Sequence, residues 1–308
     1  MNTLMSTLFL FSVLVPSKLW FAPDQPVTVH VKAEAPVNLV LVDFLGRAID
    51  TQQETAVAQE KDVDLKQLFP AMSPGTSYIL YAVPKGKGLP EFVGTPLVVQ
   101  MRRDRRTGAP PGLLTVRVEP LRYARMSTDK GDLQVAFYYD AAPNTVSNFL
   151  DLADAGYFDG QVFHRIIPGF VLQGGDPLGA DPQRAGTGGP GYMIDAEFND
   201  RPHNKGVLSM ARMGDPLERQ GQPPRSDAAN SASSQFFICL DYARTKALDG
   251  KYTAFGEVTG GMEAVDALAA VPTDPDNDRP KTPPKINSVK AVPVTPGDNP
   301  YARLLRSE

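Results

Sequence analysis

Proline and glycine interrupt this chain so often that short elements are favoured over long helices. Its 308 residues include 29 prolines and 26 glycines, the two residue types that most often mark turns and loops. The apolar, β-prone runs between these turns are only a few residues long, which is the length of a strand. The sequence therefore predicts a mainly β protein built from short strands.

The length and composition of the chain suit two globular domains. At about 100–200 residues per domain, a chain of 308 residues corresponds to two. Hydrophobic residues make up 42% and charged residues 21%, close to ordinary globular usage, which argues against disorder of the whole chain. The net charge of −4 gives no general attraction to nucleic acid, so we expect no nucleic-acid partner.

The N-terminal half consists of strand and turn sequences without a catalytic constellation. Val27, Val29 and Val31 alternate with polar residues, as in a half-buried strand. Three further β-prone runs, each bounded by turn sequences, cover residues 38–44, 78–83 and 95–101. Several short strands of this kind predict a β-sandwich-like domain over residues 1–120, whose role the sequence does not define.

Four arginines lie close together ahead of the predicted domain boundary. They occupy the run 102–106 and are followed by a glycine- and proline-rich segment at 107–112. A run of like charge usually forms a solvated loop or linker, and the alternative is a site for an anionic partner. We place the boundary between this run and Leu121.

The first fifteen residues of the chain are strongly apolar. No Lys or Arg precedes this run and no small-residue cleavage pattern follows it, so two features of a signal peptide are missing. The run is also too short to span a membrane as a helix. We therefore expect a cytoplasmic protein, with export through an atypical apolar segment as the alternative.

The sequence offers little from which to build a metal site. Cys239 lies in an apolar run, where a small buried hydrophobe is the expected role. His30, His164 and His203 are too far apart in sequence to suggest a site. We expect neither a metal nor a cofactor.

An acidic segment near the C-terminus only partly resembles a calcium loop. Asp274, Asp276 and Asp278 alternate as the first ligands of such a loop do. Pro275 interrupts the pattern, the required glycine is absent, and Lys285 stands where the bidentate acid should be. We interpret the segment as an acidic surface loop.

The C-terminal half, over residues 121–294, combines further short strands with two helices. Pro143 suits the first turn of a helix, and apolar residues at helical spacing follow it until Gly156 ends the helix. A second helix is predicted over residues 262–269. We expect a closed antiparallel β-barrel capped by two helices, followed by a C-terminal tail at 295–308.

Three ordered motifs in this half carry its chemistry. Residues 163–176 read FHRIIPGFVLQGGD, residues 208–211 and 234–238 read LSMA and SQFFI, and residues 248–256 read LDGKYTAFG. Together they resemble the cyclophilin family, and the resemblance extends from about residue 123 to residue 292. It implies a cyclophilin-like barrel and a peptidyl-prolyl cis-trans isomerase that acts on proline-containing polypeptides and assists their folding.

The implied reaction explains why no metal, cofactor or nucleophile is needed. Rotation about an X–Pro bond breaks no covalent bond, and its barrier of about 18–20 kcal/mol comes from delocalisation of the nitrogen lone pair. The prolyl nitrogen regains this lone pair at the twisted transition state. A donor aimed at that nitrogen therefore binds the transition state better than either ground state.

The resemblance also assigns roles to individual residues. Arg165 matches the catalytic arginine of the family, and arginine suits the task because it is always charged and carries its donors in a rigid fork. Gln173 matches the glutamine that holds this arginine and contacts substrate. A further set is implied to bind the peptide, with apolar members that line the proline pocket: Phe170, Val171, Ala211, Arg212, Gln235, Phe237, Leu248 and Tyr252.

Several positions depart from the family pattern. Many members have an indole before the Leu-Asp-Gly motif, where it contacts the drug cyclosporin, but this chain has Ala247, and its only tryptophan, Trp20, belongs to the other half. We expect weak or no cyclosporin binding with isomerase activity retained. Arg212 replaces a frequent asparagine, Tyr252 a frequent histidine and Val171 a frequent methionine.

A long polar segment separates Ala211 from the SQFFI strand. Residues 212–233 span about twice the length usual in the family and are rich in proline. Loops beside sites often choose substrates, so this segment could gate the groove or select peptides. A tolerated surface insertion is the equal alternative.

Two other functions remain open at the level of sequence. The barrel could be a non-catalytic module that grips proline-containing peptides during assembly. Alternatively, the first domain could carry the main function as an adhesive or client-recruiting sandwich, with the isomerase appended. The sequence does not define the oligomeric state.

Overall fold

The computed structural model describes residues 13–50, 56–57, 60–103 and 114–302. The apolar start of the chain and the end of the arginine run, with the glycine- and proline-rich segment after it, lie outside these residues. The chain divides into two compact units: one runs to Arg122 and resumes at Pro293, and the other covers Tyr123–Val292. Among the residues described, no helix is long and apolar enough to cross a membrane.

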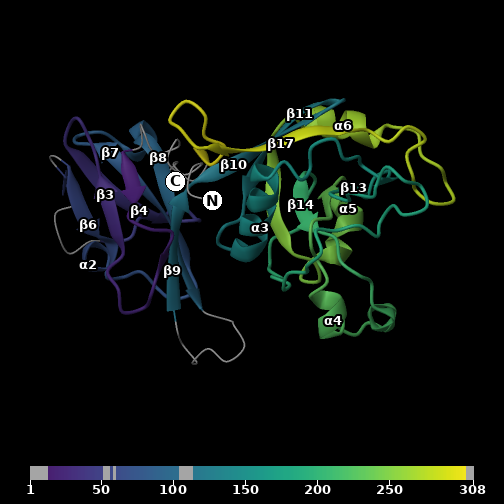
Figure 1. The fold of residues 1–308 in the computed structure, drawn as a ribbon, viewed down its shortest axis with the longest axis horizontal. Helices are drawn as coiled ribbons and strands as arrows, with labels where there is room; N and C mark the ends of the chain where they lie inside the picture. The colour runs from purple at the N-terminus through teal and green to yellow at the C-terminus, as the bar shows by residue number, and fades with distance from the viewer. Residues whose placement is uncertain (1–12, 51–55, 58–59, 104–113, 303–308) are drawn as a thin grey trace. The chain divides into compact units, whose positions relative to one another are not determined.

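Two antiparallel sheets form the first unit (Figure 1). The smaller sheet has the strand order β1–β3–β6, and the larger has the order β2–β9–β8–β7–β4–β5. The elements are β1 (Leu14–Pro16), β2 (Trp20–Phe21), β3 (Thr28–Val31), β4 (Val37–Asp43), β5 (Ala56–Val57), β6 (Lys61–Asp64), α2 (Leu65–Leu68), β7 (Ser77–Pro84), η1 (Leu89–Glu91), β8 (Val93–Arg103) and β9 (Leu114–Pro120).

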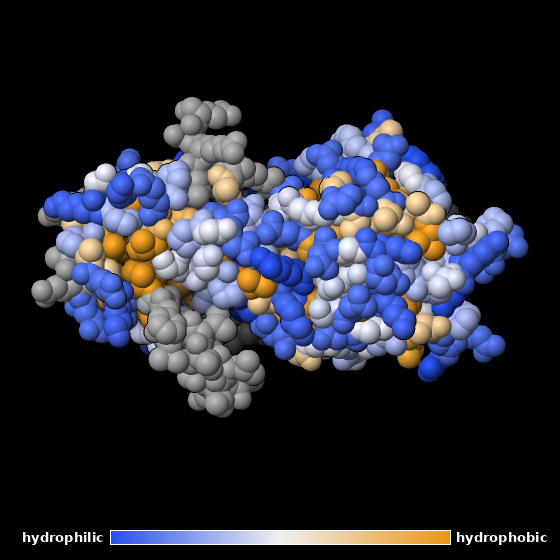
Figure 2. Space-filling view, turned by 90° about the horizontal axis from the view of Figure 1, so that it is seen from above, coloured by the Kyte–Doolittle hydropathy of each residue, from blue (hydrophilic) through white to orange (hydrophobic). Residues whose placement is uncertain are grey.

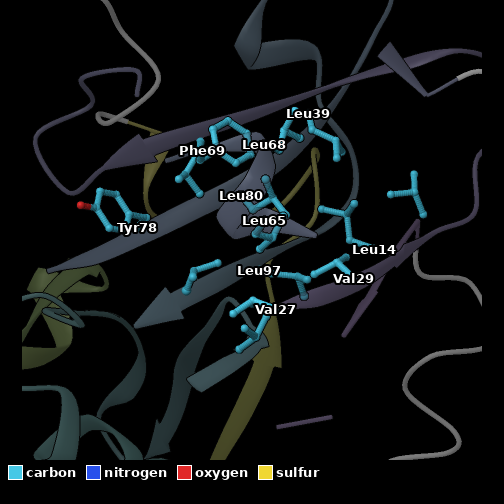
Figure 3. Packing of buried hydrophobic residues seen from close by; sticks show 14 of the residues in the cluster. Leu14, Val27, Val29, Leu39, Leu65, Leu68, Phe69, Tyr78, Leu80 and Leu97 are labelled. Atoms are coloured by element: carbon cyan, nitrogen blue, oxygen red, sulfur yellow. The ribbon is translucent and has the colours of Figure 1, made fainter. Parts of the chain in front are cut away.

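Side chains from both sheets and from α2 pack into one hydrophobic cluster (Figure 3). Leu14 and Val29 come from the smaller sheet, Leu80 and Leu97 from the larger, and Leu65 from α2, and all five are fully buried. Each such side chain contributes about 1.5–3 kcal/mol when it leaves water. Two antiparallel sheets around a shared core form a β-sandwich, as the strand pattern predicted.

One eight-stranded antiparallel sheet dominates the second unit (Figure 1). Its strand order is β12–β13–β15–β14–β16–β11–β10–β17. The strands are β10 (Arg122–Thr128), β11 (Gly131–Phe137), β12 (Arg165–Ile167), β13 (Val171–Gly174), β14 (Val207–Met210), β15 (Phe236–Cys239), β16 (Ala254–Gly260) and β17 (Ile286–Pro293). Antiparallel neighbours throughout are consistent with the predicted barrel.

The two edges of this sheet meet where the chain enters β12 and β17. Val162 and Lys285 form an isolated antiparallel bridge. On either side of it, Ile286 N donates to the carbonyl of Gln161 at 2.8 Å, and Phe163 N donates to that of Pro284 at 2.9 Å. The backbone groups of these edges are therefore paired, which closes the curled sheet.

Helices cover the ends of the sheet at the predicted positions. α3 (Pro143–Asp154) begins with its proline in the first turn, and α6 (Met262–Ala269) has the predicted bounds. Phe149 of α3 packs against the rings of Phe236 and Phe255 inside the sheet. Short helical turns, which the sequence analysis did not predict, also occur: η2 (Pro216–Gln220), α4 (Ser226–Ala229), α5 (Tyr242–Thr245) and η3 (Lys246–Leu248).

The face seen in Figure 2 is mainly hydrophilic, and apolar residues gather on it in small patches. Large side chains exposed by more than a third include Trp20 and Leu45 in the first unit, and Tyr192, Met193 and Met213 in the second. Single exposed apolar residues are normal in soluble proteins. Tyr192, Met193 and Met213 line one hollow of the second unit.

Candidate functional site

Arg165 and Gln173 face one another across a tight hairpin. β12 and β13 pair so that Arg165 lies opposite Gln173, and Gln173 lies opposite Phe237 on β15. Residues opposite one another on neighbouring strands project from the same face of a sheet, so these side chains form one row. The hairpin turns at Gly169, whose φ of 67° lies in the region that favours glycine.

A hydrophobic cluster lies on this face beside the row. It contains six of the residues that the resemblance assigned to peptide binding: Phe170, Val171, Ala211, Phe237, Leu248 and Tyr252. Val171 and Phe237 are buried, whereas Phe170, Leu248 and Tyr252 are partly exposed. The cluster therefore has a buried floor and walls that reach solvent, which suits a small apolar ring of a ligand.

Phe237 is held between two other rings. Tyr252 meets it edge-on, with ring centroids 5.8 Å apart, and His203 stacks on it at 6.3 Å. The ring nitrogens of the fully buried His203 contact Asp249 at 2.8 Å and Ser209 at 3.0 Å. Burial lowers the pKa of His203, and the hydrogen bond to Asp249 opposes that shift.

The sequence pattern did not identify His203 as a residue that supports the pocket. The three histidines lie far apart along the chain, and no motif links His203 to Phe237. Only the fold brings the imidazole beneath the pocket floor. Cys239, by contrast, is buried as predicted, and burial raises the pKa of its thiol.

The two glutamines of the site form a chain of hydrogen bonds. Gln173 Nε2 donates to Gln235 Oε1 at 3.0 Å, and Gln235 Nε2 donates to the carbonyl of Gly188 at 2.9 Å. Both glutamines line a hollow of about 890 Å³, together with Ala211 and Arg212. These polar groups therefore lie at the edge of a space large enough for several residues of an extended peptide.

Arg165 is held by Asp278, which the sequence pattern assigned to an acidic surface loop and not to the site. Its Nε and Nη2 atoms donate to Asp278 Oδ2 at 3.3 and 3.1 Å. The resemblance implied that Gln173 holds this arginine, but the Gln173 amide donates to Gln235 instead. The side chains of Arg165 and Asp278 are 44% and 36% exposed, so the pair lies at the surface of the site.

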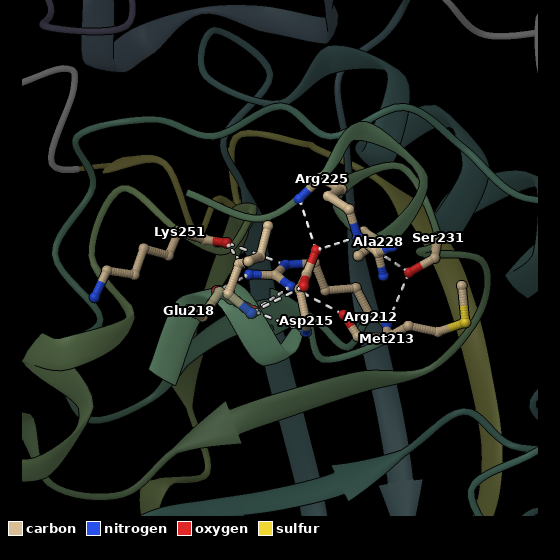
Figure 4. Close-up of polar contacts among 9 residues, drawn as sticks. Arg212, Met213, Asp215, Glu218, Arg225, Ala228, Ser231 and Lys251 are labelled. Carbon is tan, nitrogen blue, oxygen red and sulfur yellow. Dashed lines mark hydrogen bonds and ion pairs between the residues drawn. The ribbon is translucent and has the colours of Figure 1, made fainter. Parts of the chain in front are cut away.

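Polar contacts hold the long segment after Ala211 together and connect it to Lys251 (Figure 4). Arg212, whose side chain is 2% exposed, donates to both carboxylate oxygens of Glu218 at 3.0 and 2.6 Å. It also donates to the carbonyls of Met213 and Lys251. Its guanidinium lies 4.3 Å from the ring centroid of Tyr252, so the segment contacts a wall of the apolar cluster.

Asp215 organises the turn at the start of this segment. Its carboxylate accepts hydrogen bonds from the backbone nitrogens of Leu217 and Arg225 and from the Arg225 side chain. Hydrogen bonds to the two backbone nitrogens, with the nearby Arg225 guanidinium, lower the pKa of Asp215 to about 2. Asp215 and Glu218 form a capping box, whose D-x-x-E spacing was a readable signal in the sequence.

A second hollow, of about 470 Å³, lies between this segment and the residues around Ala247. Its lining combines Gly214 and Glu218 of the segment with Leu248 and Tyr252 of the apolar cluster. Ala247 stands where the resemblance places an indole. The small side chain at this position is consistent with space beside the cluster.

The arrangement suits hydrogen-bond donation to a bound ligand. The Nη1 atom of Arg165 has no protein partner among the residues described, and the apolar cluster provides a surface for a small ring. In the part of the chain that the structure covers, no group of three or more His, Cys, Asp or Glu residues could hold a metal ion. The groups that meet here can bind and polarise a ligand without covalent attack.

Comparisons with known proteins agree with the motifs. Residues 123–291 match the family described as cyclophilin type peptidyl-prolyl cis-trans isomerase/CLD. A peptidyl-prolyl cis-trans isomerase of Synechococcus elongatus is 45% identical over 44% of this chain and 78% of that protein. One of Schizosaccharomyces pombe is 41% identical over 54% and 96%, and peptidyl-prolyl cis-trans isomerase B of Streptomyces anulatus is 39% identical over 54% and 94%.

Proposed function

The chain belongs to the cyclophilin-type peptidyl-prolyl cis-trans isomerases, and we propose that Arg165 is the group through which it accelerates rotation about X–Pro bonds. Its substrates are proline-containing polypeptides, whose folding it assists. Uncatalysed exchange of such bonds takes tens to hundreds of seconds. A catalyst of this step therefore matters wherever a chain must reach one proline isomer quickly.

Arg165 contributes a donor for the transition state. As the peptide bond twists, the prolyl nitrogen becomes pyramidal and regains a lone pair that the planar ground states lack. A guanidinium N–H directed at this nitrogen stabilises the twisted state selectively. Each 1.36 kcal/mol of that selectivity corresponds to about a tenfold increase in rate.

The apolar cluster holds the proline ring so that the rest of the peptide can rotate. Phe237 and Val171 form the floor, and Phe170, Leu248 and Tyr252 form the walls. A ring buried in this cluster is anchored by apolar contact without demand on its polar atoms. When the proline ring is fixed, rotation about the X–Pro bond moves only the other side of the peptide.

The glutamine pair binds the peptide backbone next to the proline. Gln235 and Gln173 are already hydrogen-bonded to one another, so their orientation is set before a ligand arrives. The hollow beside them, with Ala211 and Arg212 in its lining, accommodates the neighbouring residues of the peptide. The replacement of asparagine by Arg212 leaves the backbone groups at this position available for the same contacts.

One observation carries the proposal. Arg165, Gln173 and Phe237 occupy opposing positions on three neighbouring strands, so a cationic donor, an amide and the pocket floor share one face. Exchange NMR of an Ala-Pro peptide, with the wild type and Arg165→Ala, tests the proposal. Loss of catalysed exchange in the variant supports it, and unchanged exchange overturns it.

We also propose that the segment 212–233 selects among substrates. Glu218 ties the segment to Arg212, and Arg212 stacks on Tyr252 in the pocket wall. The hollow of about 470 Å³ between the segment and Ala247 provides room for a side chain next to the proline. A panel of X-Pro-Y peptides tests the proposal through the order of their kcat/KM values.

A further inference from the structure

The contact between Arg165 and Asp278 uses one edge of the guanidinium and leaves the other available. An arginine has five N–H groups in a planar fork. Nε and Nη2, which form the side edge of the group, both donate to Asp278 Oδ2. Of the three remaining N–H groups, one on Nη1 and one on Nη2 point along the end edge, and the second on Nη1 points to the side of the Cδ atom. The carboxylate therefore fixes the plane of the guanidinium without using all its donors.

Asp278 adopts a backbone conformation that needs support from its surroundings. Its φ of 60° is the only positive φ of a non-glycine residue in the described ranges. Such a conformation is uncommon outside glycine, although aspartate tolerates it better than most residues. Asp278 N donates to the carbonyl of Asp274 at 2.9 Å, and the carbonyl of Asp278 accepts from Ile166 N at 2.9 Å. The second bond ties Asp278 directly to β12, beside Arg165.

The loop that carries Asp278 is itself anchored. Thr273 and Pro280 form an antiparallel bridge at its base. Next to Asp278, the guanidinium of Arg279 donates to the carbonyls of Gly179 and Ala180, both at 3.0 Å. The carboxylate thus comes from a loop that is held at its base and through Arg279.

Stability alone does not account for this arrangement. Both side chains of the pair are more than a third exposed, and ion pairs in such positions add little to the stability of a fold. A strained residue on an anchored loop, in contact with the functional arginine, is instead typical of a site where geometry matters.

We propose that Asp278 is a positioning residue that orients Arg165, so that the end edge of its guanidinium faces the bound X–Pro bond. The inference rests on the proposed role of Arg165 and extends it to the loop 272–281. Asp278 does not touch the peptide and acts only through the arginine. In this protein it takes the holding role that the family resemblance gave to Gln173.

The matched test compares substitutions at two aspartates of the same loop, Asp278 and Asp276. Asp278→Asn keeps the size of the side chain and its tolerance for positive φ, but it removes the charge that holds Arg165. Asp276→Asn removes the same charge from an exposed position that makes no contact with Arg165. For an Ala-Pro peptide we expect kcat/KM to fall about tenfold in the first variant and to stay within about twofold in the second.

Three further tests separate positioning from a general structural effect. In an Arg165→Ala background, Asp278→Asn should cause no further loss, because its effect passes through the arginine. The ¹⁵N-resolved Nε–H resonance of Arg165 should shift in Asp278→Asn but not in Asp276→Asn. Asp278→Gly accepts a positive φ freely, so a loss of activity in this variant too would assign the effect to the carboxylate.

The outcomes distinguish this inference from the proposed function. A wild-type protein without catalysed exchange would overturn the role of Arg165 and Asp278 together. An active wild type that loses activity in Arg165→Ala, but not in Asp278→Asn, would overturn the positioning role alone. Higher activity in Asp278→Asn, or an equal loss in the Arg165→Ala background, would also contradict it.

Discussion

The guanidinium of Arg212 lies 4.3 Å from the ring centroid of Tyr252 while both its Nη atoms donate to Glu218. A residue of the long segment therefore contacts the pocket wall directly. Because the side chain of Arg212 is 2% exposed, its charge depends on Glu218 and on backbone carbonyls for compensation. The segment is a folded part of the site rather than a loop beside it.

Glu218→Gln should loosen this connection. We expect the free energy of unfolding to fall by about 1–3 kcal/mol, because a buried charged donor loses its ionised partner. The order of kcat/KM values across an X-Pro-Y peptide panel should change by about threefold to tenfold, as expected when one pocket wall is altered.

Asp227→Asn is the matched control for that substitution. Asp227 belongs to the same segment, is 71% exposed, and approaches Arg225 only at 3.9 Å. The control should leave both stability and peptide preference unchanged. If Glu218→Gln also left the order of the panel unchanged, the segment would have no role in selectivity.

His164 should make the second unit sensitive to acid. Its side chain is 4% exposed, and neither ring nitrogen has a hydrogen-bond partner among the described residues. Burial lowers its pKa to about 4, although Asp176 opposes the shift. The unfolded chain, with a histidine pKa near 6.5, therefore binds the proton more readily than the folded one. Stability should fall by about 3 kcal/mol as the pH drops from about 6.5 to about 4.

Urea unfolding at pH 7 and pH 4.5 measures this loss. His164→Leu should remove most of the difference between the two pH values, and His203, whose pKa is also lowered, should account for part of the remainder. His30→Gln is the control, because Asp62 and Glu60 raise the pKa of His30. His30 therefore stabilises the fold below pH 6.5, and this stabilisation is lost as the pH rises through the pKa of His30 in the folded protein. An undiminished acid effect in His164→Leu would refute the assignment.

Phe170→Ala should weaken substrate binding more than it weakens the fold. The ring is partly exposed in the pocket wall and lies under the Arg244 guanidinium at 5.5 Å. Its removal takes away apolar contact with a bound proline, so kcat/KM should fall about tenfold. Leu45→Ala, at a site 67% exposed in the other unit, should leave kcat/KM unchanged. Equal activities of the two variants would argue against a pocket at this cluster.

Ala247 should make the protein a poor target for cyclosporin. The position lines the hollow of about 470 Å³ and offers only a methyl group, so the apolar contact of an indole with the drug is absent. Isothermal titration should detect weak or no binding, and Ala247→Trp should raise the affinity while peptide exchange continues. Complete inhibition of the wild type by micromolar drug would contradict this expectation.

Those parts of the fold and the site whose sequence signals lie within one element could be predicted from the sequence. Helices α3 and α6 follow from apolar spacing and from Pro143. Val171 and Phe237 reach the pocket floor because alternate residues of a strand share one face, and the motifs fix which face that is.

The parts that were missed depend on contacts between distant segments. Asp278 meets Arg165 across 113 residues of sequence, and the acidic pattern around it resembled a solvated loop. His203 reaches Phe237 only after β14 and β15 have paired. The resemblance implied that Arg212 binds the peptide, yet its side chain forms an ion pair with Glu218 of the neighbouring segment. No single-sequence pattern specifies which distant residues will meet in this way.

Exchange NMR of an Ala-Pro peptide, with wild type, Arg165→Lys and Arg165→Ala compared at equal concentration, tests the central claim most directly. The account predicts broadened or exchange-linked cis and trans signals with the wild type. Arg165→Lys keeps the charge but loses the fork, so catalysis should fall sharply, and in Arg165→Ala it should nearly vanish while the peptide still binds. Binding shifts without catalysed exchange in the wild type, or undiminished exchange in Arg165→Ala, would contradict it.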